Sequence, residues 1–449
     1  MNHITKLFGE FVADTQEVPA SARSAATRCI LDLLGCAIAG YGTPGASAAR
    51  RAAKAHWGNG VSPIWFSNSR LTEAGAAFAN AAMACQLDLD DGHRLAAGHP
   101  GAAVIPSAFA IRELESRFAS ELLTAICLGY EIAVRIAASR DLQSLRTTDS
   151  GQWCGAGAVA VAGKLKGSNV EIIANALAIS GTTAPGQWAT SYTKYMGNNV
   201  KEGIPAGTAN GLLGLSLAIE GFTGPVDIYD LQENYKRERL LKDLGSSWLI
   251  EGTYYKPYSA CRWAHAPVDA LLQILEENSL NASAIDSIEV NTFSRALTLN
   301  NSPTPASLED AQYSIPFCLG LAASSGRAGL LPMTGRSLEN QLALKIASKV
   351  TLEVDPELDC MFSRSVPARV TITAGNRQFS KTVLDPEGEP NNPMTDADLS
   401  AKLETLCNHA GAPALAKDVE RARSGLEEGN MGALLKLLNS PMPIHSSGV

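Results

Sequence analysis

A dense polar segment near residue 90 carries the residue types needed for acid–base catalysis. Asp88-Leu-Asp-Asp-Gly-His-Arg94 is followed closely by Gly98-His-Pro-Gly101, which places three carboxylates and two imidazoles within twelve residues. A carboxylate that orients an imidazole makes a general acid or base that works near neutral pH. We therefore expect an active-site loop in which an imidazole transfers a proton and a carboxylate orients it. The alternatives are a divalent-metal site and a solvated loop between helices.

A second polar cluster lies where helical periodicity gives way to alternating, strand-like segments. It is Lys256-Pro-Tyr-Ser-Ala-Cys-Arg-Trp-Ala-His265. Clefts form preferentially at domain junctions. Lys256 and Arg262 could hold carboxylates there, Arg262 through two parallel hydrogen bonds. The alternative is a linker with ordinary basic surface residues. We expect Cys261 to be a buried thiol rather than a nucleophile.

Two further motifs have the composition of ligand sites. Lys194-Tyr-Met-Gly-Asn-Asn-Val-Lys-Glu-Gly203 precedes a predicted helix, where backbone N–H groups and a lysine would suit an anion. Gly155-x-Gly157-x-x-Ala160 imitates a dinucleotide-binding fingerprint, but it follows no strand and lies in an Ala-rich helical stretch. We therefore reject a dinucleotide site.

Composition bounds the class of protein. The chain has 449 residues, of which 45% are hydrophobic and 18% charged, as in a globular protein of two or three domains. The net charge of −8 argues against nucleic acid and anionic membranes as partners. Nine scattered cysteines without a C-x-x-C pair argue against a disulfide framework. The start of the chain shows no signal region, and no apolar run reaches the ~18 residues of a membrane span, so we expect a cytoplasmic protein.

Most of residues 20–245 should be helical, because apolar residues recur at intervals of three and four. The stripe Ile30–Ile38 ends at Gly40, a second stripe covers 122–136, and a third covers 207–220. Ser120 is the expected N-cap of the second helix, and Pro106 is expected to start the helix before it. Helical periodicity returns over residues 395–438.

The region between these helical segments, residues 252–392, has a different pattern of apolar residues. Alternating apolar residues predict strands at 287–293, 350–354, 369–373 and 378–384, and Gly375-Asn376 predicts a hairpin between the last two. Helices are expected near 265–277 and 310–325. We therefore predict a mainly α fold, with a large all-helical domain built from both chain ends (1–251 and 393–449) and a smaller α+β lid (252–392).

The order of motifs resembles the MmgE/PrpD family, which includes 2-methylcitrate dehydratases, cis-aconitate decarboxylases and iminodisuccinate epimerase. The resemblance implies a helical domain, an α+β lid, a homodimer, and no metal or organic cofactor. It spans nearly the whole chain and rests on these segments: Leu31-Asp-Leu-Leu-Gly-Cys-Ala-Ile-Ala-Gly40, Asp88-Leu-Asp-Asp91, His99-Pro-Gly-Ala-Ala-Val-Ile-Pro106, Gly129-Tyr-Glu131, Gly221-Phe-Thr-Gly-Pro225, Lys256-Pro-Tyr-Ser-Ala-Cys261 with His265, Asp310-Ala-Gln-Tyr-Ser314, Asp355-Pro-Glu357 and Pro390-Asn-Asn-Pro-Met-Thr395.

The resemblance also implies site residues. Asp88, Asp91 and His99 match the family's first active-site loop, and Lys256 and His265 match its junction motif. The family places a lysine before the helix that ends in Gly-Phe-Thr-Gly-Pro. Counting back without a gap gives Val200 at that position, and Lys201 fits if the loop is one residue shorter.

Two residues of the family pattern are absent. Family members usually carry Gly-(Trp/Phe)-His before the Ala/Gly-rich helix, whereas residues 146–154 contain no histidine. A tyrosine usually follows the Asp-Ala-Gln-(Phe/Tyr)-Ser motif by three residues, and here Phe317 takes its place. Asp149 is a candidate to replace the histidine as a proton carrier.

Together these observations predict an enzyme that acts on a small di- or tricarboxylate by proton transfer at a carbon next to a carboxylate. His99 would transfer the proton, with Asp91 orienting or tuning it and Asp88 in support. Lys201, Lys256 and Arg262 would hold the substrate carboxylates and stabilise developing negative charge, and His265 would complete the polar wall. Dehydration is the first expectation. Epimerisation, which needs no acid for a leaving group, and decarboxylation are alternatives, as is a non-catalytic family member that binds a metabolite.

Overall fold

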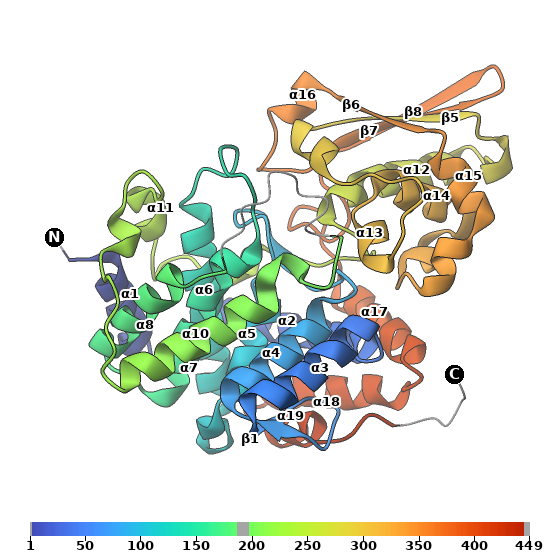
Figure 1. Cartoon of the computed structure of the whole chain (residues 1–449). Helices are drawn as coiled ribbons and strands as arrows, with labels where there is room; N and C mark the ends of the chain where they lie inside the picture. Colours follow the sequence, from blue (N-terminus) through green and yellow to red (C-terminus); the bar gives the residue numbers. More distant parts are fainter. Residues whose placement is uncertain (1, 186–196, 444–449) are drawn as a thin grey trace.

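The computed structural model describes residues 2–185 and 197–443 and is mainly α-helical. Figure 1 shows a helical body with a smaller sheet-containing unit at one end. The three predicted stripes form α2 (Ala20–Gly40), α6 (Ala119–Ala138) and α10 (Ile204–Ile219), which confirms the helices expected from periodicity. The rejected dinucleotide fingerprint lies inside helix α7 (Cys154–Lys166), as expected.

The body is a set of closely packed helices around one hydrophobic core. Helices α4 (Glu73–Cys85), α5 (Gly101–Ala110), α6, α7 and α10 pack against one another, and α8 (Val170–Thr182) covers α7 and α10. Small residues allow these close contacts. A Cβ added at Gly211 of α10 would lie 2.2 Å from the carbonyl oxygen of Gly155 of α7, so only glycine permits this separation.

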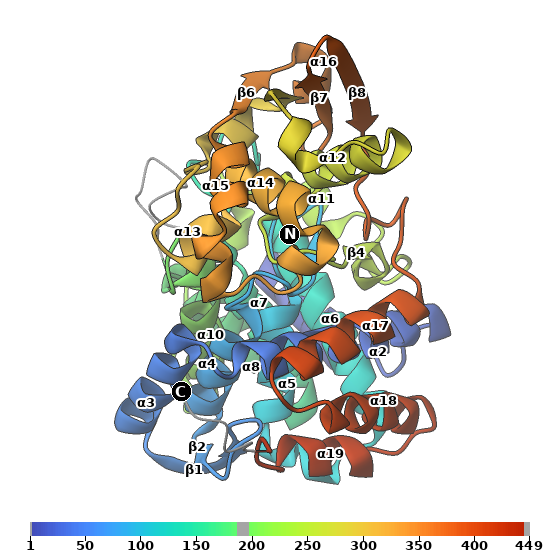
Figure 2. The same ribbon diagram turned by 90° about the vertical axis from the view of Figure 1, so that its right-hand side faces the viewer.

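The chain returns to the body at its C-terminal end. Helices α17 (Asp396–His409) and α18 (Ala414–Glu427) lie beside α2, and α19 (Gly432–Leu438) packs against α18 (Figure 2). The buried ammonium group of Lys402 on α17 donates to Asp32 of α2 at 2.6 Å and to the carbonyl oxygen of Leu89 at 2.8 Å. This pair ties the C-terminal segment to the loop that carries the first polar cluster.

The second unit combines a four-stranded sheet with helices. Strands β5 (Ser287–Thr292), β6 (Val350–Val354), β7 (Ala368–Ala374) and β8 (Arg377–Val383) occur in the order β6-β5-β7-β8. The β5–β6 pair is parallel and the other pairs are antiparallel. Helices α12 (His265–Glu277) and α14 (Ile315–Ser325) pack with this sheet around a second core. The four strands and the 375–376 hairpin agree with the prediction.

The two hydrophobic cores are built from different segments of the chain. Buried residues of the first core come from segments 4–255 and 394–438, and those of the second from 258–383. We keep the division 1–251, 252–392 and 393–449 as a proposal, because a shared hydrophobic core is what makes a segment a folding unit.

Two predicted helix starts are wrong. Helix α5 begins at Gly101 and contains Pro106, because the Asp91 carboxylate accepts the N–H of Gly101 at 3.1 Å and so caps the helix from ten residues away. Helix α6 begins after Phe118 rather than after Ser120. The Glu121 carboxylate accepts the Phe118 N–H at 2.8 Å and stabilises this earlier start.

Within the described ranges of the chain, no single helix combines the length and apolar character needed to cross a membrane. Helices α2 and α3 (Pro44–Trp57) meet both measures only when taken together, and they are bent by 93° relative to each other.

Candidate active site

The two predicted polar clusters meet in the structure. The short strand β3 (Gly92–His93), in the loop between α4 and α5, pairs antiparallel with β4 (Thr253–Tyr254) just before the second cluster. This pairing brings His99 and Lys256 into one buried group, with exposed fractions of 6% and 0%. The loop and the junction segment therefore act as the two walls of a single site.

The His99 imidazole is held in one tautomer. Its Nδ1 lies 2.8 Å from the main-chain carbonyl oxygen of Asp91. A carbonyl oxygen can only accept, so Nδ1 carries the proton and Nε2 of the neutral ring is left as an acceptor. The His99 N–H donates to Ser150 Oγ at 3.0 Å, which fixes the backbone as well. Nε2 is therefore the ring nitrogen that remains available as an acceptor.

Three carboxylates surround this imidazole. Asp88 Oδ1 lies 3.9 Å and Glu202 Oε1 3.8 Å from Nε2, while Asp90 Oδ2 lies 3.4 Å from Nδ1. Asp88 has a left-handed backbone with φ of 53°, an unusual conformation for a residue other than glycine. Two of these carboxylates face the acceptor nitrogen and one faces the protonated nitrogen.

Asp91 contributes differently from the expectation. Its carboxylate points away from the imidazole and accepts hydrogen bonds from the Tyr130 hydroxyl and the Gly101 N–H. Burial raises the pKa of this carboxyl to about 7. The group that orients His99 is therefore the main-chain carbonyl of Asp91, and the carboxylate caps helix α5.

Lys256 forms a buried ion pair with Asp88. Its Nζ lies 3.2 Å from Asp88 Oδ1 and donates to the Asp88 main-chain oxygen, also at 3.2 Å. Burial alone would raise the pKa of Asp88, but Lys256, Lys201 and His99 together lower it to about 2. Burial lowers and Asp88 raises the pKa of Lys256, with a net increase. Both groups are charged at neutral pH.

Lys201, rather than Val200, is the residue that points inward. Lys201 is 2% exposed, whereas Val200 is 50% exposed. Lys201 Nζ donates to Gln312 Oε1 at 2.5 Å and lies 5.3 Å from the centre of the Tyr313 ring. These partners are uncharged, whereas the Lys256 ammonium is paired with the Asp88 carboxylate. Of the 194–203 motif, residues 194–196 lie outside the described residues.

Arg262 and His265 interact mainly with the protein itself. Arg262 donates to Glu389 at 2.8 Å, to the main-chain oxygens of Glu387 and Pro386, and to His265 Nδ1 at 3.1 Å. His265 Nε2 donates to the Ala260 oxygen at 3.1 Å. Burial and then Arg262 lower the pKa of His265 well below its ordinary value. This differs from the expectation that Arg262 holds a substrate carboxylate.

These contacts belong to a clamp between the two units. Glu389 pairs with both Arg94 and Arg262, and the two guanidinium groups lie 4.9 and 4.8 Å from the Tyr254 ring. Sequence reasoning missed Glu389 because it lies about 300 residues from Arg94 in the chain. His265 supports this clamp by accepting a hydrogen bond from Arg262.

Glu202 and Ser150 are the other residues that the sequence did not single out. The Glu202 carboxylate accepts hydrogen bonds from Ser150 Oγ at 2.8 Å and from the Ser150 N–H at 3.4 Å. Lys201, Glu202 and Gly203 have φ angles of 47°, 56° and 72°. Two non-glycine residues in the left-handed region are a strained arrangement of the kind found at functional sites. The only sign of Glu202 in the sequence was its position next to Lys201, the lysine that the family resemblance implies.

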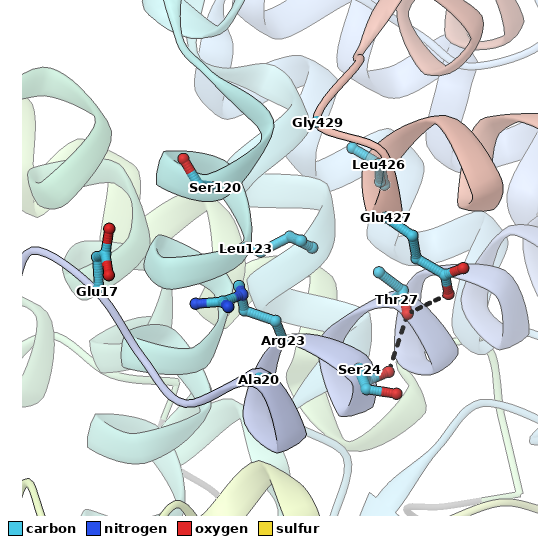
Figure 3. Close-up of a pocket in the computed structure, with 10 residues that line it drawn as sticks. All are labelled: Glu17, Ala20, Arg23, Ser24, Thr27, Ser120, Leu123, Leu426, Glu427 and Gly429. Carbon is cyan, nitrogen blue, oxygen red and sulfur yellow. Dashed lines mark hydrogen bonds between the residues drawn. The ribbon is translucent and has the colours of Figure 1, made fainter.

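Other parts of the structure offer fewer side chains that could bind or transform a ligand. Among residues 2–185 and 197–443, no three His, Cys, Asp or Glu side chains are arranged to hold a metal ion. Figure 3 shows a surface pocket of about 430 Å³ between α2, α6 and α18. Arg23 in this pocket donates to the Val18 oxygen, and Thr27 bonds to Ser24 and Glu427. These polar groups stabilise neighbouring helices, so we place the active site at His99.

A buried imidazole with carboxylates and lysines, positioned between a helical body and an α+β unit, defines an acid–base site of the kind found in enzymes. Comparison with known families agrees with this class. Residues 7–239 match the MmgE/PrpD N-terminal domain and residues 258–428 the MmgE/PrpD C-terminal domain. The chain therefore belongs to the MmgE/PrpD family, as its motifs predicted.

Curated relatives extend the comparison. Cis-aconitate decarboxylase of Aspergillus terreus is 26% identical over 470 aligned positions, which cover 95% of this chain and 94% of the relative. A cis-aconitate decarboxylase-like protein of Aspergillus oryzae is 27% identical over 298 positions, which cover 61% of each chain. The similarity to the first relative extends through both units.

Proposed function

We propose that this protein is a lyase-type enzyme that acts on a small di- or tricarboxylate by proton transfer at a carbon next to a carboxylate. One observation carries the proposal: His99 presents an acceptor Nε2 inside a buried site that also holds two lysine ammonium groups. The relatives named as cis-aconitate decarboxylases support a polycarboxylate as the substrate class.

The geometry suggests a role for each group. Lys201, whose partners are uncharged, binds a substrate carboxylate and stabilises the charge that develops on it as the neighbouring carbon loses its proton. His99 Nε2 accepts that proton. The Asp88 carboxylate, held by Lys256, lies beside Nε2 and stabilises the positive charge that the ring gains when it takes the proton. Burial excludes bulk water and strengthens these interactions.

Dehydration is the finer proposal. After the carbon loses its proton, loss of hydroxide from the neighbouring carbon gives an alkene and water. Decarboxylation is the second candidate, because the two relatives are named for it; there carbon dioxide leaves and the protein delivers a proton to carbon. Epimerisation would return the proton to the opposite face. The homodimer and the cytoplasmic location implied by the resemblance also remain proposals.

Proton NMR in D2O separates these reactions. We would screen citrate, 2-methylcitrate, cis-aconitate, malate, tartrate and iminodisuccinate with the wild-type protein and the His99→Ala variant. His56→Ala, which changes an exposed histidine on α3, is the matched control. An alkene signal formed from a hydroxy acid indicates dehydration, a new product accompanied by release of carbon dioxide indicates decarboxylation, and exchange with a changed diastereomer indicates epimerisation. In each case His99→Ala should abolish the change and His56→Ala should retain it. Calorimetric binding of an acid without turnover would contradict the proposal in favour of a metabolite-binding protein.

A further inference from the structure

Dehydration requires a second proton carrier besides His99. Hydroxide is a poor leaving group, so an acid must protonate it as the carbon–oxygen bond breaks. The histidine that family members usually place before the Ala/Gly-rich helix is absent from residues 146–154 of this chain. The structure brings two carboxyl groups, those of Glu202 and Asp149, to this part of the site.

Glu202 is held so that one oxygen faces the reaction space. Its Oε2 accepts both hydrogen bonds from Ser150, and its Oε1 lies 3.8 Å from His99 Nε2. Because Oε2 already receives two donors, the proton of the neutral acid belongs on Oε1. The left-handed backbone at Glu202 is the local cost of aiming the side chain in this direction.

A second buried carboxyl group, that of Asp149, lies next to the serine that binds Glu202. Asp149 is 1% exposed and precedes Ser150, whose hydroxyl and N–H both donate to Glu202. Burial, and then the charge of Glu202, raise the pKa of Asp149 to about 7, while a hydrogen bond with Thr147 and the charge of Arg140 act in the opposite direction. Glu202 in turn faces the His99 imidazole and adds to the rise in the pKa of the Tyr313 hydroxyl. Two neighbouring buried carboxyls disfavour a doubly ionised state.

We propose that Glu202 and Asp149 form a carboxyl pair that retains one proton, and that Glu202 donates this proton to the departing hydroxyl group. The inference rests on the dehydration proposed above. In the reaction His99 Nε2 takes the proton from carbon, the carbon–oxygen bond breaks, and the hydroxyl leaves as water with the proton of Glu202. The imidazolium then returns its proton across the 3.8 Å separation to Glu202, so the enzyme ends in its starting state.

A leaving-group comparison tests the role of Glu202. The probes are an acid that the wild-type protein dehydrates and its analogue with fluoride in place of the hydroxyl, because fluoride leaves without protonation. We expect Glu202→Gln to lose about 10²–10⁴-fold in rate with the hydroxy acid and less than about tenfold with the fluoro acid. The His99→Ala variant should lose both activities, and Glu220→Gln, an exposed change after α10, should lose neither. Equal losses of Glu202→Gln on the two substrates would overturn the assignment.

Infrared difference spectroscopy tests the shared proton without any substrate. The wild-type protein should lose a carboxylic-acid C=O band as the pH is raised through about 7. Since the pKa of Asp91 is also raised to about 7, the assignment comes from the variants. Part of the band should be missing from Asp149→Asn and Glu202→Gln. Identical bands in all three proteins would refute the carboxyl pair, whereas a changed band with no turnover of any acid would refute only the proposed function.

Discussion

The buried pair of Lys256 and Asp88 allows a quantitative test of the site's electrostatics. The pKa of Asp88 is about 2, against an ordinary value of 3.8. This difference corresponds to about 2 kcal/mol of folding free energy. Because the folded-state pKa is lowered, this stability is present above about pH 4 and is lost as the pH falls through about 2. The Lys256→Met variant should lose it at pH 7 and also leave a buried charge without its partner.

We expect Lys256→Met to lower the free energy of unfolding by about 3–5 kcal/mol, the usual effect of breaking a buried ion pair. The double variant Lys256→Met/Asp88→Asn should recover about 2 kcal/mol of this loss, because it removes the unpaired charge. Asparagine tolerates the left-handed backbone of position 88. Urea unfolding at pH 7 measures all three proteins, with Lys54→Met on the exposed face of α3 as the control. A double variant no more stable than the single one would refute the reasoning.

Three further predictions concern the surroundings of His99. In Gly101→Ala the new Cβ would lie 2.4 Å from the Tyr130 hydroxyl oxygen and 2.5 Å from an Asp91 carboxylate oxygen. Urea unfolding should therefore show a free energy of unfolding lower by about 1–3 kcal/mol. An unchanged free energy would mean that the loop relaxes freely. Since burial raises the pKa of Asp91 to about 7, wild-type stability should fall as pH rises from about 4 to 7 and then level off. Asp91→Asn should show a smaller fall in unfolding curves across pH, because Asp149 contributes the remainder; a fall as steep as that of the wild type would contradict the prediction. Arg262→Met should lower thermal stability but change KM by less than about threefold, because Glu389 and main-chain oxygens already bind the guanidinium group. A large rise in KM at unchanged thermal stability would instead identify Arg262 as a substrate ligand.

Much of the fold could be predicted from local patterns. The period of three to four residues identified α2, α6 and α10, and strict alternation identified β5–β8. These patterns are reliable because each element buries one face, and burial follows the geometry of the element. The starts of α5 and α6 were predicted wrongly because Asp91 and Glu121 cap them, and side-chain caps depend on contacts rather than on periodicity.

The candidate site was predictable in its membership more than in its contacts. Motif order pointed to His99, Lys256 and Lys201, and the structure gathers all three in one buried cluster. Glu202 was not distinguished from any other glutamate, because its importance comes from a left-handed backbone and from Ser150, some fifty residues earlier. Arg262 looked like a carboxylate ligand because its residue type suits that role and Glu389 is remote in sequence.

By itself, the sequence determined the mainly α architecture, the position of the strands and the family, and it pointed to His99, Lys201 and Lys256 as candidate site residues. Each of these is written in residue types and their spacing, which local physical chemistry can interpret. Only the tertiary structure decided which nitrogen of His99 is available, that a main-chain carbonyl rather than the Asp91 carboxylate orients it, and that Lys201 has uncharged partners. These properties depend on distances of a few ångströms between segments far apart in the chain, and such distances are set by how the helices pack.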